Sequence, residues 1–217
     1  MTGIKICGLS DEAGVEAAGA GGADFAGFVF YPPSPRCVSP ERAAVLAEKL
    51  PPGTKSVALL VDPDDTVLDY VLNRFTPDYI QLHGDETPKQ ILDIKKEFSP
   101  KIIKAIRIGS KRDLLKSMAY DGIADMLMFD AKIEGSALPG GTGQAFDWSI
   151  LEGHKPETPW MLAGGLTAEN VKEALSRLHP DVVDVSSGVE SAPGQKDPAK
   201  IADFIRAVKN HDHSEQP

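Results

Sequence analysis

Eight short apolar segments recur along the 217-residue chain, and their spacing restricts the fold more than any other feature. Most are continuous runs of Val, Ile, Leu, Met and Phe, which is typical of strands buried on both faces of a parallel sheet. Most begin about 20–25 residues apart, which leaves room for one helix after each strand. The segments are IKIC (4–7), FAGFVF (25–30), SVALLV (56–61), YIQL (79–82), IIKAI (102–106), MLMF (126–129), WMLAG (160–164) and VVDVS (182–186).

Segments with helical spacing of apolar residues separate these strands. Ser39 can cap a helix, Pro40 suits its first turn, and Glu41 suits the positive end of the helix dipole. Another start is predicted at Thr167, where TAENV places Glu169 in the first turn. The predicted helices cover residues 11–20, 39–50, 65–75, 87–98, 110–120, 146–151, 167–178 and 197–210.

Regular alternation of strand and helix predicts an α/β fold with parallel strands and crossover helices. Eight such units within residues 1–210 favour a single (β/α)8 TIM barrel, with a closed parallel eight-stranded sheet and outer helices. A doubly wound open sheet is the alternative. No shift in composition divides the chain, so we expect one domain, followed by a polar tail at 211–217 that frays.

Composition narrows the classes of function. The net charge is -9, and no run of Lys or Arg would build a nucleic-acid site, so we expect no nucleic-acid partner. The two cysteines, Cys7 and Cys37, are too few for a disulfide scaffold and lack zinc-site spacing. With no signal peptide and no apolar stretch near the roughly 20 residues of a membrane span, we expect a cytoplasmic protein.

Two loops near the end of the predicted barrel suggest a phosphate site. Active sites of TIM barrels lie at the carboxyl ends of the strands, and phosphate often binds after strands seven and eight. Gly164 and Gly165 follow the seventh strand and precede a helix, so their backbone N–H groups can approach an anion. Ser186, Ser187 and Gly188 offer further donors after the eighth. The alternative is two ordinary turns.

The loop after the sixth strand, residues 131–145, is unusually long for a compact domain, and such loops are often functional. Its glycine-rich part includes Gly141, Thr142 and Gly143. We expect this loop either to close over the ligand or to donate N–H groups to the phosphate.

Four further side chains lie where predicted strands end. Cys7 and Asp130 are a candidate base and acid, since thiol and carboxyl pKa values can be tuned by their surroundings. Arg36 follows a stiff proline-rich segment and suits a carboxylate ligand, and His83 can hydrogen-bond a substrate. The alternatives are a buried core cysteine, a loop-capping aspartate, a solvated arginine and a structural histidine.

With these residues the sequence resembles the phosphoribosylanthranilate isomerase family. The similarity extends over nearly the whole chain, and KICG, QLHG and SSGVE are specific when they occur together. The matching segments are KICGLSD (5–11), GFVFYPPSPRCVSP (27–40), YIQLHGDE (79–86), FDAKIEG with PGGTGQAFDW (129–148), LAGGLTAENV (162–171) and VDVSSGVE (183–190).

The resemblance implies an aldose–ketose isomerase, an intramolecular oxidoreductase of tryptophan biosynthesis. Its substrate would be the small molecule N-(5-phosphoribosyl)anthranilate, rearranged to 1-(2-carboxyphenylamino)-1-deoxyribulose 5-phosphate. By resemblance Asp130 is the general acid, Cys7 the general base and Arg36 the partner of the anthranilate carboxylate. His83 lies near the substrate. The glycine and serine loops bind phosphate, helped by the stretch 141–143.

This chemistry needs no metal and no redox cofactor, and no membrane partner is expected; monomer and homodimer both fit. The rival functions are the histidine-pathway isomerase and indole-glycerol-phosphate synthase. The first uses an aspartate base where this chain has Cys7, and the second needs a catalytic lysine and glutamate at strand ends. A non-catalytic phosphate-ligand binder is the rival of a different class, and it need not keep both Cys7 and Asp130.

Overall fold

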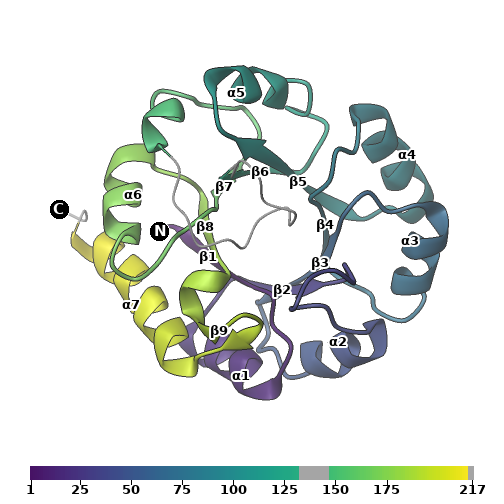
Figure 1. Cartoon of the computed structure of the whole chain (residues 1–217), viewed down its shortest axis with the longest axis horizontal. Coiled ribbons are helices and arrows are strands. Elements are labelled where there is room, and N and C mark those ends of the chain that lie inside the picture. The colour runs from purple at the N-terminus through teal and green to yellow at the C-terminus, as the bar shows by residue number, and fades with distance from the viewer. Residues whose placement is uncertain (132–146, 215–217) are drawn as a thin grey trace.

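A computed structural model describes residues 1–131 and 147–214 of the chain. Within them, eight parallel strands form a closed barrel in chain order, surrounded by helices (Figure 1). Because β1 pairs with both β2 and β8, the predicted TIM barrel is confirmed and the open sheet is excluded. The strands are β1 (Gly3–Cys7), β2 (Phe25–Val29), β3 (Lys55–Leu60), β4 (Tyr79–Leu82), β5 (Lys101–Ile108), β6 (Met126–Ala131), β7 (Trp160–Leu162) and β8 (Val182–Val185).

The helices lie outside the barrel, near the positions that apolar spacing predicts. The Ser39 side chain accepts a hydrogen bond from the Arg42 amide (3.2 Å), so the predicted cap of α2 is confirmed. The helices are α1 (Glu12–Gly21), α2 (Pro40–Ala47), α3 (Asp65–Leu72), α4 (Pro88–Phe98), α5 (Lys111–Ser117), α6 (Val171–Leu178) and α7 (Pro198–Ser214), with 3-10 helices η1 (Trp148–Ile150) and η2 (Ser187–Val189).

The start of α6 differs from the prediction. The helix begins at Val171 rather than at Thr167. Asn170 accepts a hydrogen bond from the Thr167 amide (2.8 Å) and donates one to the Gly165 carbonyl (2.9 Å). These bonds hold the preceding residues in a turn, so the helix does not follow the glycine pair directly.

The end of the chain also differs from the prediction. Helix α7 continues to Ser214, because Asp212 accepts hydrogen bonds from the Thr2 amide (2.6 Å) and hydroxyl (3.1 Å). His211 is buried against Ser176. The expectation of a frayed tail is therefore wrong for residues 211–214, and residues 215–217 lie outside the described part.

Alternation along the strands separates two packed layers. On β6, Met126 and Met128 belong to the cluster inside the barrel, whereas Leu127 and Phe129 pack against the helices. Asp130 continues the inward series at the end of the strand. A functional side chain at the barrel mouth is thus placed by the same period of two that builds the core.

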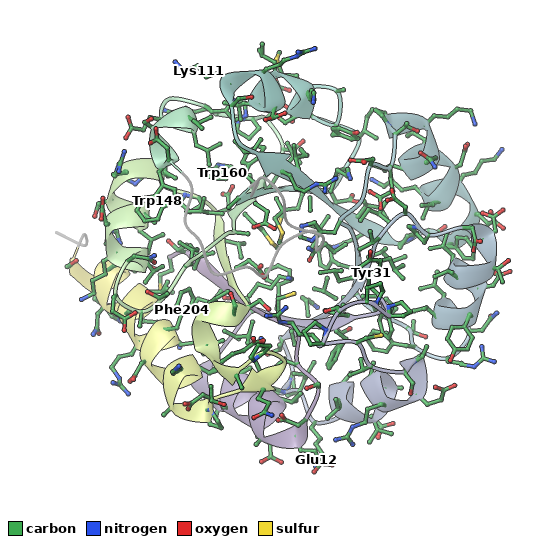
Figure 2. All side chains as sticks on the ribbon, viewed as in Figure 1. Glu12, Tyr31, Lys111, Trp148, Trp160 and Phe204 are labelled. Atoms are coloured by element: carbon green, nitrogen blue, oxygen red, sulfur yellow. The ribbon has the colours of Figure 1, made fainter. Side chains whose placement is uncertain are left out.

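The outer layer contains most of the large aromatic side chains. Trp148, Trp160 and Phe204 pack between barrel and helices, whereas Glu12 and Lys111 lie at the outer rim (Figure 2). The two tryptophans therefore have a structural role in this layer. After β8, an unpredicted hairpin of β9 (Glu190–Ala192) and β10 (Gln195–Lys196) precedes α7.

Candidate active site

A pocket opens where the strands end. It brings together nine of the residues singled out from the sequence, and the other three, Gly141, Thr142 and Gly143, lie outside the described residues. Tyr31, which also lines it, lies on the inner side of the ring of helices (Figure 2). The nine are Cys7, Arg36, His83, Asp130, Gly164, Gly165, Ser186, Ser187 and Gly188.

On one wall, Asp130 is held by its neighbours. Its Oδ1 accepts the Ala131 amide (2.9 Å), and its Oδ2 lies 3.1 Å from His83 Nε2. The amide nitrogen of Gln81 lies 3.0 Å from the other ring nitrogen of His83. That amide donates, so Nδ1 accepts and the ring proton lies on Nε2, facing Asp130. His83 therefore orients Asp130, which the sequence does not indicate.

On the opposite wall, Arg36 forms a bidentate ion pair with Glu190. Its Nε donates to Oε1 (2.7 Å) and its Nη2 to Oε2 (2.8 Å). Both side chains are buried, so two parallel charge-assisted bonds fix the plane of the guanidinium. The loop from β2 therefore presents a pre-oriented cation to the pocket.

Glu190 also joins Arg36 to Lys196 of the hairpin, whose Nζ lies 2.7 Å from Oε1. Burial works to raise the pKa of Glu190, but the hydrogen bond from Arg36 and the charge of Lys196 outweigh it and lower that pKa. Lys196 also donates to the Ser186 carbonyl (2.9 Å). The hairpin thus ties the loop after β2 to the loop after β8. Nothing in the sequence indicates this link, because its strands are too short to give a pattern.

Cys7 ends β1 with its side chain facing the pocket, and it is 5% exposed. Burial raises the pKa of the Cys7 thiol, and the charge of Lys5, on the same face of β1, works against that rise. Lys5 in turn forms an ion pair with Asp184 of β8 (2.7 Å). The thiol therefore has both apolar neighbours, Val29 and Leu59, and charged ones.

The loops after β7 and β8 have the backbone that the phosphate prediction requires. Gly164 and Gly165 have positive φ angles of 90° and 66°, which glycine adopts without strain. A Cβ on Gly188 would lie 2.0 Å from the Leu166 carbonyl oxygen, so a side chain there would push the two loops apart. Both turns depend on glycine, and both line the pocket.

The described residues contain neither a metal-binding cluster nor a membrane-spanning helix. No group of three or more His, Cys, Asp or Glu side chains there is arranged to hold a metal ion. No helix in the same part of the chain is long and apolar enough to cross a membrane.

Sequence comparison connects this geometry to known proteins. Residues 4–207 match the family described as N-(5'phosphoribosyl)anthranilate (PRA) isomerase. The chain belongs to this family. It is 50% identical over 209 residues to the N-(5'-phosphoribosyl)anthranilate isomerase of Parvibaculum lavamentivorans, covering 95% of this chain and 97% of that relative. The resemblance noted in the sequence is therefore confirmed.

Solved structures of the family have the same fold. The phosphoribosyl anthranilate isomerase of Thermotoga maritima superposes with a TM-score of 0.87 at 35% identity, covering 97% of this chain and 100% of that one. A second phosphoribosyl anthranilate isomerase structure is a complex with reduced 1-(o-carboxyphenylamino)-1-deoxyribulose 5-phosphate. It superposes with a TM-score of 0.81 at 32% identity, covering 97% of this chain and 100% of that one.

Lys5 and Asp184 are the functional candidates that the sequence analysis missed. Both are charged residues inside apolar strands, IKIC and VVDVS. A charge in a buried strand requires a partner, and this signal was available from the sequence. Their pairing was not, because it depends on closure of the barrel.

Proposed function

We propose that this chain is a phosphoribosylanthranilate isomerase of tryptophan biosynthesis. It converts N-(5-phosphoribosyl)anthranilate into 1-(2-carboxyphenylamino)-1-deoxyribulose 5-phosphate by an Amadori rearrangement. The observation that carries the proposal is the placement of Cys7 and Asp130 in one pocket with two glycine loops and a fixed guanidinium. One base, one acid and two anion clamps are what this reaction needs, without metal or redox cofactor.

The first step assigned to the pocket is ring opening. Asp130 delivers a proton to the ribose ring oxygen, the bond between this oxygen and C1′ breaks, and the anthranilate nitrogen supplies the electrons that form a Schiff base. His83 shares its Nε2 proton with Asp130 Oδ2 across 3.1 Å, and this contact keeps the carboxyl group aimed into the pocket. His83 is in this view a positioning residue for the acid.

The second step is proton abstraction from C2′. The Cys7 thiolate takes this proton, and the C2′ electrons move toward the Schiff base to give an enolamine. The enolamine tautomerises to the ketone product. Cys7 ends β1 and Asp130 lies on β6, which do not pair with each other. This arrangement suits a substrate that lies across the pocket with one group on each side.

Each end of the substrate carries an anion. We assign the phosphate to the loops containing Gly164, Gly165, Ser186, Ser187 and Gly188, because their glycine backbone allows close approach. Residues 141–143 are assigned as additional hydrogen-bond donors to the phosphate.

Arg36 engages the anthranilate carboxylate, with Glu190 fixing its orientation. The variant Arg36→Ala is expected to weaken substrate binding more than the binding of inorganic phosphate. Equal losses would refute the carboxylate role.

We take the barrel, whose last helix α7 ends at Ser214, as the catalytic domain, working in the cytoplasm as a monomer or homodimer. The experiment that tests the function follows the loss of substrate fluorescence with freshly made phosphoribosylanthranilate. Wild-type protein turns the substrate over, while Cys7→Ala and Asp130→Asn each lose orders of magnitude in kcat and keep the folded circular dichroism spectrum. Absence of turnover by the wild type contradicts the function, and near-normal turnover by Cys7→Ala contradicts only the base assignment.

A further inference from the structure

A buried ion pair lies beneath Cys7. The Lys5 side chain is 0% exposed, and its ammonium lies 2.7 Å from Asp184 Oδ1. Taking both charges out of water costs several kcal/mol per ion, so such a pair is weak evidence for stability. A buried charge that faces a reactive group is better explained by its effect on that group.

Strand register brings Lys5 to this place. Lys5 pairs with Asp184 across β1 and β8, and it lies two residues before Cys7. Asp184 and Cys7 therefore both point to the inside of the barrel, as Lys5 does. Gly27 of β2 lies opposite Cys7 in the register. A Cβ on Gly27 would be 3.1 Å from Cys7 Sγ and 3.3 Å from Lys5 Nζ. The thiol and the ammonium therefore border the same small space, which a larger residue would fill.

Other charges also face Cys7. The charge of Lys5 works to lower the pKa of the thiol, and the charge of Lys196 on β10 works in the same direction. Asp184 opposes both. His83 and Asp130 face the pocket from β4 and β6. Lys5 is thus the cation with the largest effect on the thiol, and its ion pair with Asp184 fixes its position.

We propose that Lys5, anchored by Asp184, is a positioning residue that stabilises the thiolate of Cys7. The inference rests on the proposed function only in giving Cys7 the role of base. When the Cys7 thiol loses its proton to solvent, the sulfur becomes the partner of the Lys5 ammonium. When the thiolate takes the C2′ proton, it returns to a neutral thiol, and Lys5 keeps its own proton throughout.

The test measures ionisation of Cys7 without substrate, in a Cys37→Ser background, so that Cys7 is the single thiol. Thiolate absorbance in the ultraviolet and the rate of alkylation by iodoacetamide are recorded against pH. In Lys5→Met the midpoint of Cys7 ionisation is expected to rise by about one pH unit, and alkylation at neutral pH is expected to be roughly tenfold slower. A folded Lys5→Met protein with the wild-type midpoint overturns the proposal.

Two more variants keep the test decisive if Lys5→Met does not fold. Lys5→Met/Asp184→Asn removes both charges and leaves no unpaired carboxylate, and its midpoint is expected between those of wild type and Lys5→Met. Lys5→Arg keeps the charge and is expected to stay near the wild-type midpoint. A double variant that titrates like wild type overturns the proposal.

The matched control is Lys104→Met, which breaks another buried lysine–carboxylate pair, with Glu86. Its Cys7 midpoint is expected to match wild type, and a rise equal to that of Lys5→Met would show a general structural effect and overturn the proposal. None of these measurements uses the substrate. If Lys5→Met shifts the midpoint of Cys7 ionisation but the wild-type protein has no isomerase turnover, the proposed function is contradicted and this inference is not.

Discussion

Three lysine–carboxylate pairs are buried among the described residues, and the two whose lysine lies on a barrel strand differ in the side of the sheet that they occupy. Lys5 points into the barrel and meets Asp184 at 2.7 Å. Lys104 lies between the inward residues Ile103 and Ala105 of β5, so it points outward and meets Glu86 at 2.6 Å. Both lysines are at most 2% exposed. On the barrel strands, the same pair chemistry therefore faces the pocket in one case and the helices in the other.

The surroundings of the outer pair explain its role. Lys104 also donates to the Gly84 carbonyl (2.7 Å), and Glu86 accepts the amides of Gly84 (3.0 Å) and Asp62 (2.9 Å). These bonds satisfy backbone groups of the loop that follows His83. Lys5, by contrast, is next to a titrating thiol. A buried pair that faces the helices therefore fixes a loop, whereas one that faces the barrel mouth acts on a reactive group.

The largest expected effect is on stability. Lys104→Met leaves Glu86 buried without its cation, so we expect a loss of about 3–5 kcal/mol in the free energy of unfolding. Urea denaturation followed by circular dichroism measures it. A loss below about 1 kcal/mol would mean that water or the backbone replaces Lys104, and that the outer pair is not what fixes the loop.

The pH dependence of activity should separate the two pairs next. Burial raises the pKa of Cys7, and the base must be a thiolate, so kcat/KM is expected to rise with pH on the acid side of that pKa. The rise is about tenfold per pH unit, or roughly a hundredfold over two units. Lys5→Met is expected to move this rise in kcat/KM to higher pH, and Lys104→Met is expected to leave it in place. A limb that falls with rising pH would contradict the thiolate base.

Glu190 forms the third buried lysine–carboxylate pair, with Lys196, and it also holds Arg36. Glu190→Gln keeps its shape but removes the charge, and hydrogen bonds to charged groups contribute about 1.5–3 kcal/mol. We expect KM for phosphoribosylanthranilate to rise about tenfold, with a smaller change in kcat, because Arg36 loses its fixed orientation. Steady-state kinetics measure the two constants. An unchanged KM would show that Arg36 does not depend on Glu190.

The smallest effect is expected for an exposed pair. Arg177 bonds Glu152 at 2.7 Å on the surface, where solvent screens both charges. Arg177→Gln is expected to leave the urea midpoint, the Cys7 titration and KM unchanged. A clear loss of stability in this variant would show that distance alone, and not burial, decides what such pairs contribute.

Much of the fold could be predicted because the strands carry a strong local signal. The segment 79–82 coincides with β4, and the apolar run before Asp130 places this carboxylate at the end of β6. Boundaries were less accurate where side-chain hydrogen bonds override apolar spacing, as at the start of α6, where Asn170 holds a turn. The hairpin after β8 was missed because its strands have only three and two residues.

The sequence by itself determined the barrel and most of the residues that line its mouth. Continuous apolar runs and helical spacing are local properties, and family motifs fall at the strand ends. Only the tertiary structure decided the partners. Lys5 and Asp184 are 179 positions apart, and Arg36 and Glu190 are 154 apart. Closure of the barrel brings the first and last strands together, so no local pattern can show which buried charges meet.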